Sequence, residues 1–276
     1  MALTRRAALK GALATTVGAV TGSAIYGGVY ERHALELTES ELPIDSLPDA
    51  LEGLRIGFLT DIHHSEMVSA DDVRRAVAIA HAANPDLIVL GGDYVTWGNR
   101  SYVGPCAELL GTLKAPNGVF AVLGNHDDDR DMPAALAAQH ITVMRDARTS
   151  LRIRGETLDI VGIRFWTRRA QDIGRLLGSV QGPTLLLAHD PSRLNQAAAL
   201  GISGVLSGHT HGGQVVLPGI GPIAARRFPV VAGLGVRNRT SIFVSRGIGT
   251  VYVPVRINCP PEVAMITLRR RRRQPA

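Results

Sequence analysis

Residues 54–93, LRIGFLTDIHHSEMVSADDVRRAVAIAHAANPDLIVLGGD, contain the pattern that decides the fold. An apolar run is followed by a polar cluster, an alanine-rich amphipathic segment and a second apolar run that again ends in polar residues. A helix is predicted over Asp72 to Ala83, because Ser69 and Asp72 form a capping-box start and Asn84-Pro85 ends it. Strands that alternate with helices favour an α/β domain.

The same pattern continues to about residue 268. Turn residues around Gly155 predict a hairpin, and the Gly- and Pro-rich segment 218–236 predicts a long loop suited to a lid or to substrate contact. We expect one domain over 54–268, preceded by a linker over 31–53 that leads to an entry strand or loop. The predicted strands are 54–60, 87–91, 119–123, 158–163, 184–188, 204–207, 241–245 and 263–268.

Polar clusters follow five of these strands. They are Asp61-Ile62-His63, Gly92-Asp93, Gly124-Asn125-His126-Asp127, His189-Asp190 and Gly208-His209-Thr210-His211. Carboxyl ends of strands are where α/β sheets bind ligands, so the side chains are expected to converge. One cluster alone is compatible with a structural role, whereas five in this order favour a shared binding site.

The side chains in these clusters are typical of a metal site. Carboxylates, imidazoles and an amide oxygen form a mixed nitrogen and oxygen set, which suits zinc, manganese or iron. Two cysteines in the whole chain exclude a four-thiolate zinc site and a disulfide framework. The potential ligands exceed what one ion needs, and two ions roughly 3.5–4 Å apart that share a carboxylate would use them.

The order of the clusters closely resembles the metallophosphoesterase, or calcineurin-like phosphoesterase, family over residues 54–268. The resemblance implies a four-layer α-β-β-α sandwich and a phosphoesterase with a dinuclear metal site at one edge, whose nucleophile is a bridging hydroxide. It implies that His126 faces the substrate and that Asp127 orients it. The implied ligands are Asp61, His63 and His211 for one ion, Asn125, His189 and His209 for the other, and Asp93 bridging both.

Departures from the family pattern indicate the subclass. The protein Ser/Thr phosphatases of the family carry an Asp-Arg pair where Thr96-Trp97 stand and Glu where Asp127 stands, which argues against a protein phosphatase. Residues 208–214 and 254–262 resemble an exported or membrane-associated bacterial phosphodiesterase subgroup, some members of which cleave the pyrophosphate of a nucleotide-linked lipid. His64 and Arg246 are weaker candidates for substrate contact. Trp97 and Trp166 either pack or line a substrate cleft.

The first 30 residues resemble a twin-arginine export signal. Arg5-Arg6 and Lys10 precede an uncharged stretch rich in Ala, Gly, Val and Thr, and Gly22-Ser23-Ala24 offers a cleavage site, although Ala8 stands where Phe is usual. The resemblance implies the twin-arginine machinery as a partner, export of the folded protein, and a location in the periplasm or on the outer face of the cytoplasmic membrane. The alternative is an N-terminal membrane anchor.

The distribution of charge argues against nucleic acid as a partner. The net charge is +6, but three basic residues lie within 1–30 and five in the tail 269–276, which leaves 22 basic against 24 acidic residues between them. A nuclease is therefore disfavoured, and the arginine tail either contacts anionic lipid or is solvated. The leading hypothesis is a metal-dependent hydrolase of phosphodiester or pyrophosphate bonds, with a lipid-linked substrate or a non-catalytic metal-binding scaffold as alternatives.

Overall fold

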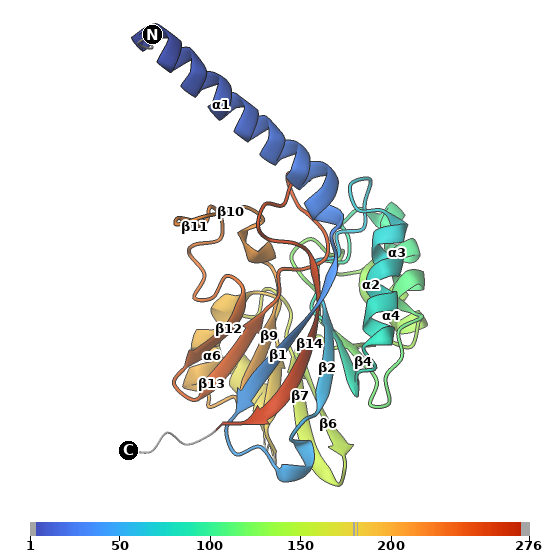
Figure 1. Ribbon diagram of the computed structural model, residues 1–276. Coiled ribbons are helices and arrows are strands. Elements are labelled where there is room, and N and C mark those ends of the chain that lie inside the picture. Colours follow the sequence, from blue (N-terminus) through green and yellow to red (C-terminus); the bar gives the residue numbers. More distant parts are fainter. Residues whose placement is uncertain (1–3, 179, 181, 272–276) are drawn as a thin grey trace, which may run out of the picture.

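Two six-stranded sheets stack face to face in the computed structural model (Figure 1), which describes residues 4–178, 180 and 182–271. The first sheet has the order β1 (Glu36–Ile44), β14 (Glu262–Arg270), β2 (Arg55–Leu59), β3 (Leu87–Leu90), β4 (Val119–Ala121) and β5 (Thr142–Val143). The second has the order β12 (Gly233–Arg237), β13 (Thr240–Val244), β9 (Gly204–Ser207), β8 (Thr184–Leu187), β7 (Glu156–Gly162) and β6 (Ala147–Ile153).

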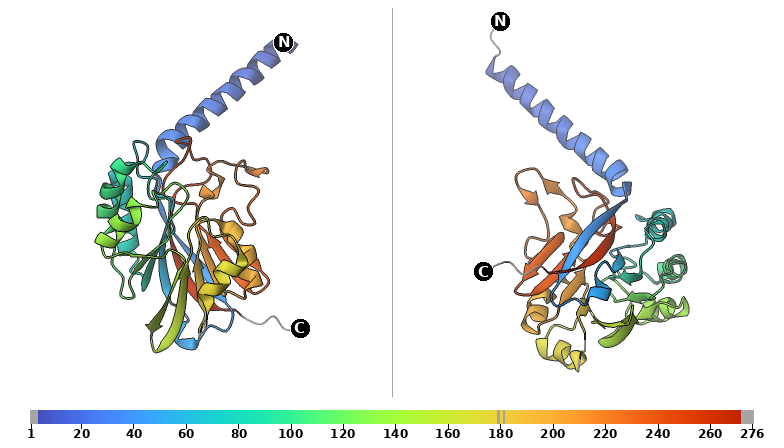
Figure 2. Two further views of the ribbon diagram at one scale, coloured as in Figure 1. Left: turned by 180° about the vertical axis from the view of Figure 1, so that it is seen from behind. Right: turned by 60° about the horizontal axis from the view of Figure 1, so that its bottom comes forward.

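Helices cover the outer face of each sheet (Figure 2). The first sheet is covered by α2 (Ala70–Ala82), α3 (Val103–Leu110) and α4 (Asp131–Ala138), and the second by α5 (Ala170–Leu177) and α6 (Leu194–Ala199). The predicted four-layer α-β-β-α sandwich is confirmed. A small ribbon of β10 (Val216–Leu217) and β11 (Gly221–Pro222) stands apart, and the short helices are η1 (Tyr26–Tyr30), η2 (Glu31–His33), η3 (Asp49–Leu51), η4 (Arg100–Tyr102), η5 (Pro191–Arg193) and η6 (His211–Gly213).

The central core lies between the two sheets. Phe58 of β2 and Phe243 of β13 meet edge to face across it, with ring centroids 6.4 Å apart. Burial of each large apolar side chain there contributes about 1.5–3 kcal/mol. The sheets approach closely at Gly204, where a Cβ atom would lie 2.8 Å from the side chain of Ile44.

Each predicted strand overlaps an observed strand, and the helix prediction holds. Helix α2 begins at Ala70, two residues earlier than expected, and has the predicted capping box: the Ser69 side chain accepts from the backbone of Asp72, and the Asp72 carboxylate accepts from the backbone of Ser69. The hairpin around Gly155 is formed by β6 and β7.

The boundary predicted at residue 54 is wrong, because part of the expected linker is a strand of the first sheet. Strand β1 runs parallel to β14, with Leu42 and Ile44 buried in the central core. The predicted loop 218–236 is likewise interrupted by β11 and the start of β12. The domain therefore includes the segment from Glu36 onward.

An N-terminal helix, α1 (Arg5–Ile25), extends away from the body in Figure 1. In the described part of the chain, no helix combines the length and the apolar character that a membrane crossing requires. The body begins at Gly27, where a Cβ atom would lie 2.4 Å from the carbonyl oxygen of Arg256. The predicted cleavage site therefore lies just before the first residue that contacts the body closely.

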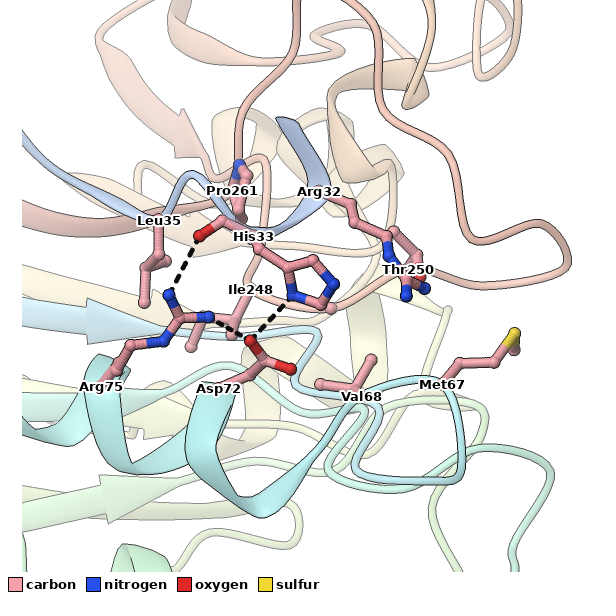
Figure 3. A pocket seen from close by; sticks show the side chains of 11 residues that line it. Arg32, His33, Leu35, Met67, Val68, Asp72, Arg75, Ile248, Thr250 and Pro261 are labelled. Carbon is pink, nitrogen blue, oxygen red and sulfur yellow. Dashed lines mark hydrogen bonds and ion pairs between the residues drawn. The ribbon is translucent and has the colours of Figure 1, made fainter. Parts of the chain in front are cut away.

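The segment after α1 is attached to the body by buried polar contacts. The Glu31 carboxylate accepts a 2.6 Å hydrogen bond from the backbone N–H of Cys259. Figure 3 shows His33 beside α2, where its Nδ1 lies 3.0 Å from Asp72 and the Arg75 guanidinium bonds both the Asp72 carboxylate and the His33 carbonyl. These contacts attach residues 31–33 to α2 and to the segment that precedes β14.

Three arginines of the expected basic tail belong to the folded domain. Arg269 and Arg270 end β14, and Arg271 follows it. They form ion pairs with Glu41, Asp49 and Asp45 respectively, so their charges are matched by the domain itself. Arg272 and Arg273 lie outside the described residues.

Candidate metal centre

The polar clusters converge because parallel strands of both sheets end at the same edge. Strands β2, β3 and β4 run parallel in the first sheet, and β8 and β9 run parallel in the second. The turns after them carry all the predicted metal ligands. Asp61, His63, Asp93 and Asn125 lie in turns that follow strands of the first sheet. His189, His209 and His211 lie in turns that follow strands of the second sheet.

Six of these side chains form two groups of potential ligands. In each group the ligand atoms lie within 4.8 Å of one another. The first group is Asp61, His63 and His211, and the second is Asp93, His189 and His209. In the first, the Nε2 atoms of His63 and His211 are 3.2 Å apart, and His211 Nε2 is 3.3 Å from Asp61 Oδ1. This grouping matches the division into two ions that the resemblance implies.

Asp93 lies between the two groups. Its Oδ2 atom is 3.1 Å from His189 Nε2 in one group and 3.5 Å from His63 Nε2 in the other. A bridging carboxylate needs this position, since it must reach both ions. The bridging role itself stays a prediction.

Unpaired polar atoms in this region fit bound cations. Asn125 Oδ1 is buried and has no hydrogen-bond partner in the described part of the chain, and His189 Nε2 has only the Asp93 carboxylate beside it, at 3.1 Å. Buried polar atoms in folded proteins are nearly always paired, so such atoms need a partner of another kind. An acceptor oxygen and an imidazole nitrogen beside two carboxylates are ligands that a divalent ion would satisfy. The residues present therefore fit the predicted ions.

The backbone at the site is held in an uncommon conformation. Five of the seven predicted ligands have positive φ angles, in the left-handed region that non-glycine residues seldom adopt. The angles are 52° at Asp61, 51° at His63, 57° at Asp93, 73° at His209 and 51° at His211. Each such residue costs on the order of 1 kcal/mol or more, so the surrounding structure must impose these turns.

Burial and neighbouring charges set the protonation of the ligands. Burial lowers the pKa values of His63 and His209 to about 4, which leaves both imidazoles neutral and able to bind a metal at neutral pH. Burial raises the pKa of Asp61 to about 6. At Asp93 burial opposes ionisation, but the neighbouring histidines, His189 foremost, hold the pKa well below its usual range. His189, although burial disfavours its charge, has its pKa raised to about 10 by Asp93.

His126 lies beside the ligands, and its ring is held by another group. Its backbone N–H donates to Asp93 Oδ1 at 2.8 Å, and its ring Nδ1 accepts the backbone N–H of Trp97 at 3.3 Å. A neutral ring that accepts at Nδ1 carries its proton on Nε2. The centroid of the His63 ring is 5.0 Å away. The Nε2–H of His126 is therefore available as a hydrogen-bond donor next to the first group of ligands.

Residues 54–213 match the family model of the calcineurin-like phosphoesterases. The chain belongs to this family. This metallophosphoesterase is 30% identical over 283 residues to the uncharacterized metallophosphoesterase YkuE of Bacillus subtilis, and the match covers 97% of this chain and 98% of the relative. It is 31% identical over 225 residues to the phosphodiesterase YaeI of Escherichia coli, with coverage of 78% and 82%.

A third relative is longer than the metallophosphoesterase described here. It is the transmembrane protein with metallophosphoesterase domain of Danio rerio, which is 32% identical over 268 residues; the match covers 89% of this chain and 60% of that protein. Together the family and these relatives show a hydrolase that acts on phosphoester bonds.

The role predicted for Asp127 in this metallophosphoesterase is wrong. Its carboxylate accepts hydrogen bonds of 2.8, 2.7 and 2.8 Å from the backbone N–H groups of Asp93, Tyr94 and Gly124. In the described residues it makes no contact with the His126 ring, which the Trp97 N–H orients instead. Asp127 thus joins the turn after β3 to the turn after β4. Burial raises its pKa to about 7.

The two weaker substrate candidates are also corrected. His64 is buried, its Nδ1 lies 2.9 Å from the carbonyl oxygen of Val68, and its ring packs against Tyr102. The Arg246 guanidinium is bonded by two carboxylates, Glu262 and Glu36, at 2.9 and 2.6 Å. Neither side chain is available to a phosphate, and the partners of Arg246 could not be identified from its local sequence.

A cleft of about 600 Å³ opens beside the ligands of the metallophosphoesterase. It is lined by His209 and His211 and by apolar side chains of two loops, among them Phe228 and Tyr252. Tyr252 and Trp97 are 71% and 66% exposed, with ring centroids 5.3 Å apart, and the Trp97 ring lies 4.5 Å from that of His126. Trp97 thus lies at the site, whereas no pattern in the sequence indicated Tyr252.

Proposed function

We propose that this metallophosphoesterase hydrolyses phosphodiester or pyrophosphate bonds with two divalent ions, manganese, zinc or iron, held by the seven predicted ligands. The observation that carries the proposal is the pair of ligand groups that meet at Asp93. The unpaired Oδ1 atom of Asn125 supports it, because a buried acceptor oxygen needs a partner that a bound cation would supply. The ions would neutralise charge on the phosphate and activate the attacking water.

The chain itself contributes a hydrogen-bond donor and a fixed geometry. A bond forms between phosphorus and the oxygen of water while the bond from phosphorus to the leaving oxygen breaks, and the leaving oxygen takes up the proton that the attacking water gives up. The Nε2–H of His126 would donate a hydrogen bond to that leaving oxygen, since the Trp97 N–H holds the ring in the tautomer that carries this hydrogen. Asp127 keeps the turns that bear Asp93 and Asn125 in register.

The finer proposal is that the substrate is lipid-linked, as in a nucleotide pyrophosphatase of the cell envelope. Exposed apolar side chains around the cleft support a substrate with an apolar part. They include Ile223, Tyr252 and Val253, which are 54%, 71% and 53% exposed. The membrane contact included in this proposal would involve the same end of the molecule, since α1 leaves the body there (Figure 1).

We also propose export by the twin-arginine route, with the enzyme in the periplasm or on the outer face of the cytoplasmic membrane. Arg5 and Arg6 begin α1, and close contacts with the body start only at Gly27. Fusion of residues 1–35 to a reporter tests the route. Export should stop when Arg5-Arg6 is replaced by Lys-Lys, and export that persists without the twin-arginine machinery would refute it.

The hydrolase proposal is tested with purified protein loaded with manganese, zinc or iron in turn. We expect about two ions per chain and faster release of p-nitrophenol from the bis ester of phosphate than from the mono ester. A wild-type protein that binds two ions but turns over neither ester would favour the non-catalytic scaffold. Preferential cleavage of single-stranded DNA would favour the nuclease.

A further inference from the structure

Two phenylalanine rings flank His209, the most exposed histidine among the predicted ligands. Phe165, in the turn between β7 and α5, has its ring centroid 5.5 Å from that of His209. Phe228, in the segment between β11 and β12, is 5.2 Å from it. The rings come from separate segments of the chain and contact the same imidazole.

An arginine guanidinium lies over each of these phenylalanine rings. The guanidinium carbon of Arg168 lies 6.0 Å from the centre of the Phe165 ring and 5.3 Å from that of Trp166. The guanidinium carbon of Arg227 lies 5.0 Å from the centre of the Phe228 ring. Arg227 and Phe228 both line the cleft beside the ligands. Two cationic groups therefore lie one aromatic ring away from the second ligand group.

Both arginines lack a partner for their N–H groups. Within residues 4–178, 180 and 182–271, neither has a carboxylate at ion-pair distance or a side-chain hydrogen bond, and both are exposed. Neighbouring arginines differ: Arg193 pairs with Asp190 at 3.1 Å, and Arg226 bonds backbone carbonyl groups of its own loop. The charges of Arg168 and Arg227 are thus free to meet an anionic ligand.

Stacking on an aromatic ring suits a guanidinium for phosphate binding. The ring contacts the flat face of the group and restricts its motion, while the N–H groups at its edge stay free. Those N–H groups match two oxygens of a phosphate in a bidentate contact. The two aromatic rings therefore position both arginines for a phosphate without using their hydrogen bonds.

We propose that Arg168 and Arg227 form a second anion-binding position, which holds the phosphate next to the scissile one in a diphosphate substrate. The proposal rests on the proposed hydrolase function and narrows it from phosphodiesters in general to phosphoric anhydrides. In this proposal the scissile phosphate contacts the ions held by the two ligand groups, and it also contacts His126. Each arginine lies on a phenylalanine ring that contacts His209, so it is further from the ligand groups than that ring is. We expect the second phosphate of the substrate to bind there.

The kinetic test compares two substrates in two variants. Diadenosine diphosphate contains a second phosphate, and bis(p-nitrophenyl) phosphate does not. For Arg168→Gln and Arg227→Gln, kcat/KM for the diphosphate should fall about tenfold or more beyond any loss with the aryl ester, because a charge-assisted contact is removed. Equal losses with both substrates, or no loss with either, would overturn the proposal.

Arg237→Gln is the matched control. Arg237 is an exposed arginine that pairs in register with Thr240 at the amino end of β13, whereas the site lies at the carboxyl ends of the strands. Both substrates should be turned over by this variant as by the wild type. Metal content and Tm are measured for all variants, so that a loss of folding or of ions is seen directly.

Binding provides a readout that does not depend on turnover. At saturating manganese, the wild type should bind ADP about tenfold or more tightly than AMP, and Arg227→Gln should lose most of this preference. An unchanged ratio of the two affinities would refute the second phosphate position. If the wild type hydrolysed neither substrate, the hydrolase proposal would fail, and the ratio measured by calorimetry would still decide the role of the arginines.

Discussion

His126 is distinguished from the neighbouring histidines by the partner of its ring. Its Nδ1 accepts a backbone N–H, whereas the histidines of the two ligand groups direct ring nitrogens toward carboxylates or toward each other. This arrangement fixes a proton on Nε2 without a carboxylate partner, so the ring does not depend on Asp127. Hydrogen bonding to the substrate and metal binding are therefore predicted for different side chains.

The first prediction separates these two roles. His126→Ala should keep about two ions per chain and lower kcat for the bis ester by about 10²–10³, the usual effect of removing a hydrogen-bond donor that faces developing negative charge. Metal analysis and steady-state kinetics on the same sample measure both. His81→Ala, which changes an exposed histidine in the last turn of α2, is the control and should behave as the wild type. Loss of metal from the His126 variant would make His126 a structural residue of the site.

The second prediction concerns the carboxylate between the ligand groups. Asp93→Asn should bind fewer than two ions per chain and lose nearly all activity, because the amide carries no charge to hold both ions. Asp128→Asn removes a carboxylate in the turn after β4 that pairs instead with Arg100, and it should retain both ions. Two tightly bound ions in the Asp93 variant would contradict the bridging assignment.

At the scale of elements, the segment between α1 and β1 is attached to the body by polar contacts that its sequence does not predict. The buried Glu31 carboxylate satisfies the backbone N–H of Cys259, and His33 contacts the capping residue Asp72 of α2. The glycines of α1, at positions 11, 18 and 22, have no atom within 4 Å of a Cβ position, whereas Gly27 packs closely against Arg256. The body should therefore be stable without α1 but not without residues 31–33.

Truncation tests this division. A chain that starts at Tyr26 should keep the Tm of the full chain within about 1 °C, provided that both are loaded with metal. A chain that starts at Leu35 should melt about 5 °C or more lower, since an unpaired buried N–H costs about 1–3 kcal/mol and each kcal/mol lowers Tm by about 2–4 °C at this size. Thermal denaturation followed by circular dichroism measures both. An equal loss for the shorter truncation would show that α1 itself stabilises the body.

The elements that the sequence predicts are those with a local signal. Strands such as β3 and β8 are continuous apolar runs, and α2 has its own capping box, so each is specified by adjacent residues. Strand β1 reads ELTESELPI, with mostly exposed polar residues in its first half. Its place is fixed by distant partners, such as the pairing of Glu41 with Arg269 of β14, which no local pattern contains.

At the scale of the whole molecule, the positions of the ligands could be predicted, but the groups that hold the neighbouring side chains could not. Ligand positions follow from strand ends, which a sequence shows directly. The roles of Asp127 and Arg246 depend on backbone groups and carboxylates brought together by folding, such as the contact of Arg246 with Glu36, 210 residues away. Folding likewise brings the Phe165 and Phe228 rings, with the arginines near them in the sequence, to His209.

Metal removal should lower the stability of the whole domain. Each ion present at about 100 times its Kd adds about 2.7 kcal/mol, and two ions together should raise Tm by about 10 °C or more. Differential scanning calorimetry before and after chelation, with metal added back, measures the shift. The shift should be much smaller for Asp93→Asn. An identical Tm with and without metal would argue that the two groups are not ligand sites.

The left-handed turns at Asp61, His63, Asp93, His209 and His211 have a consequence for any attempt to transfer this site to another protein. Because the ligands depend on backbone shape as well as on side chains, grafting the same seven residues onto ordinary strand ends would not reproduce their directions. Glycine at 92 illustrates the constraint, since a Cβ atom there would lie 2.4 Å from the backbone nitrogen of Gly124. A working transplant would therefore have to carry the turns together with the residues beside the ligands that allow the chain to follow this path.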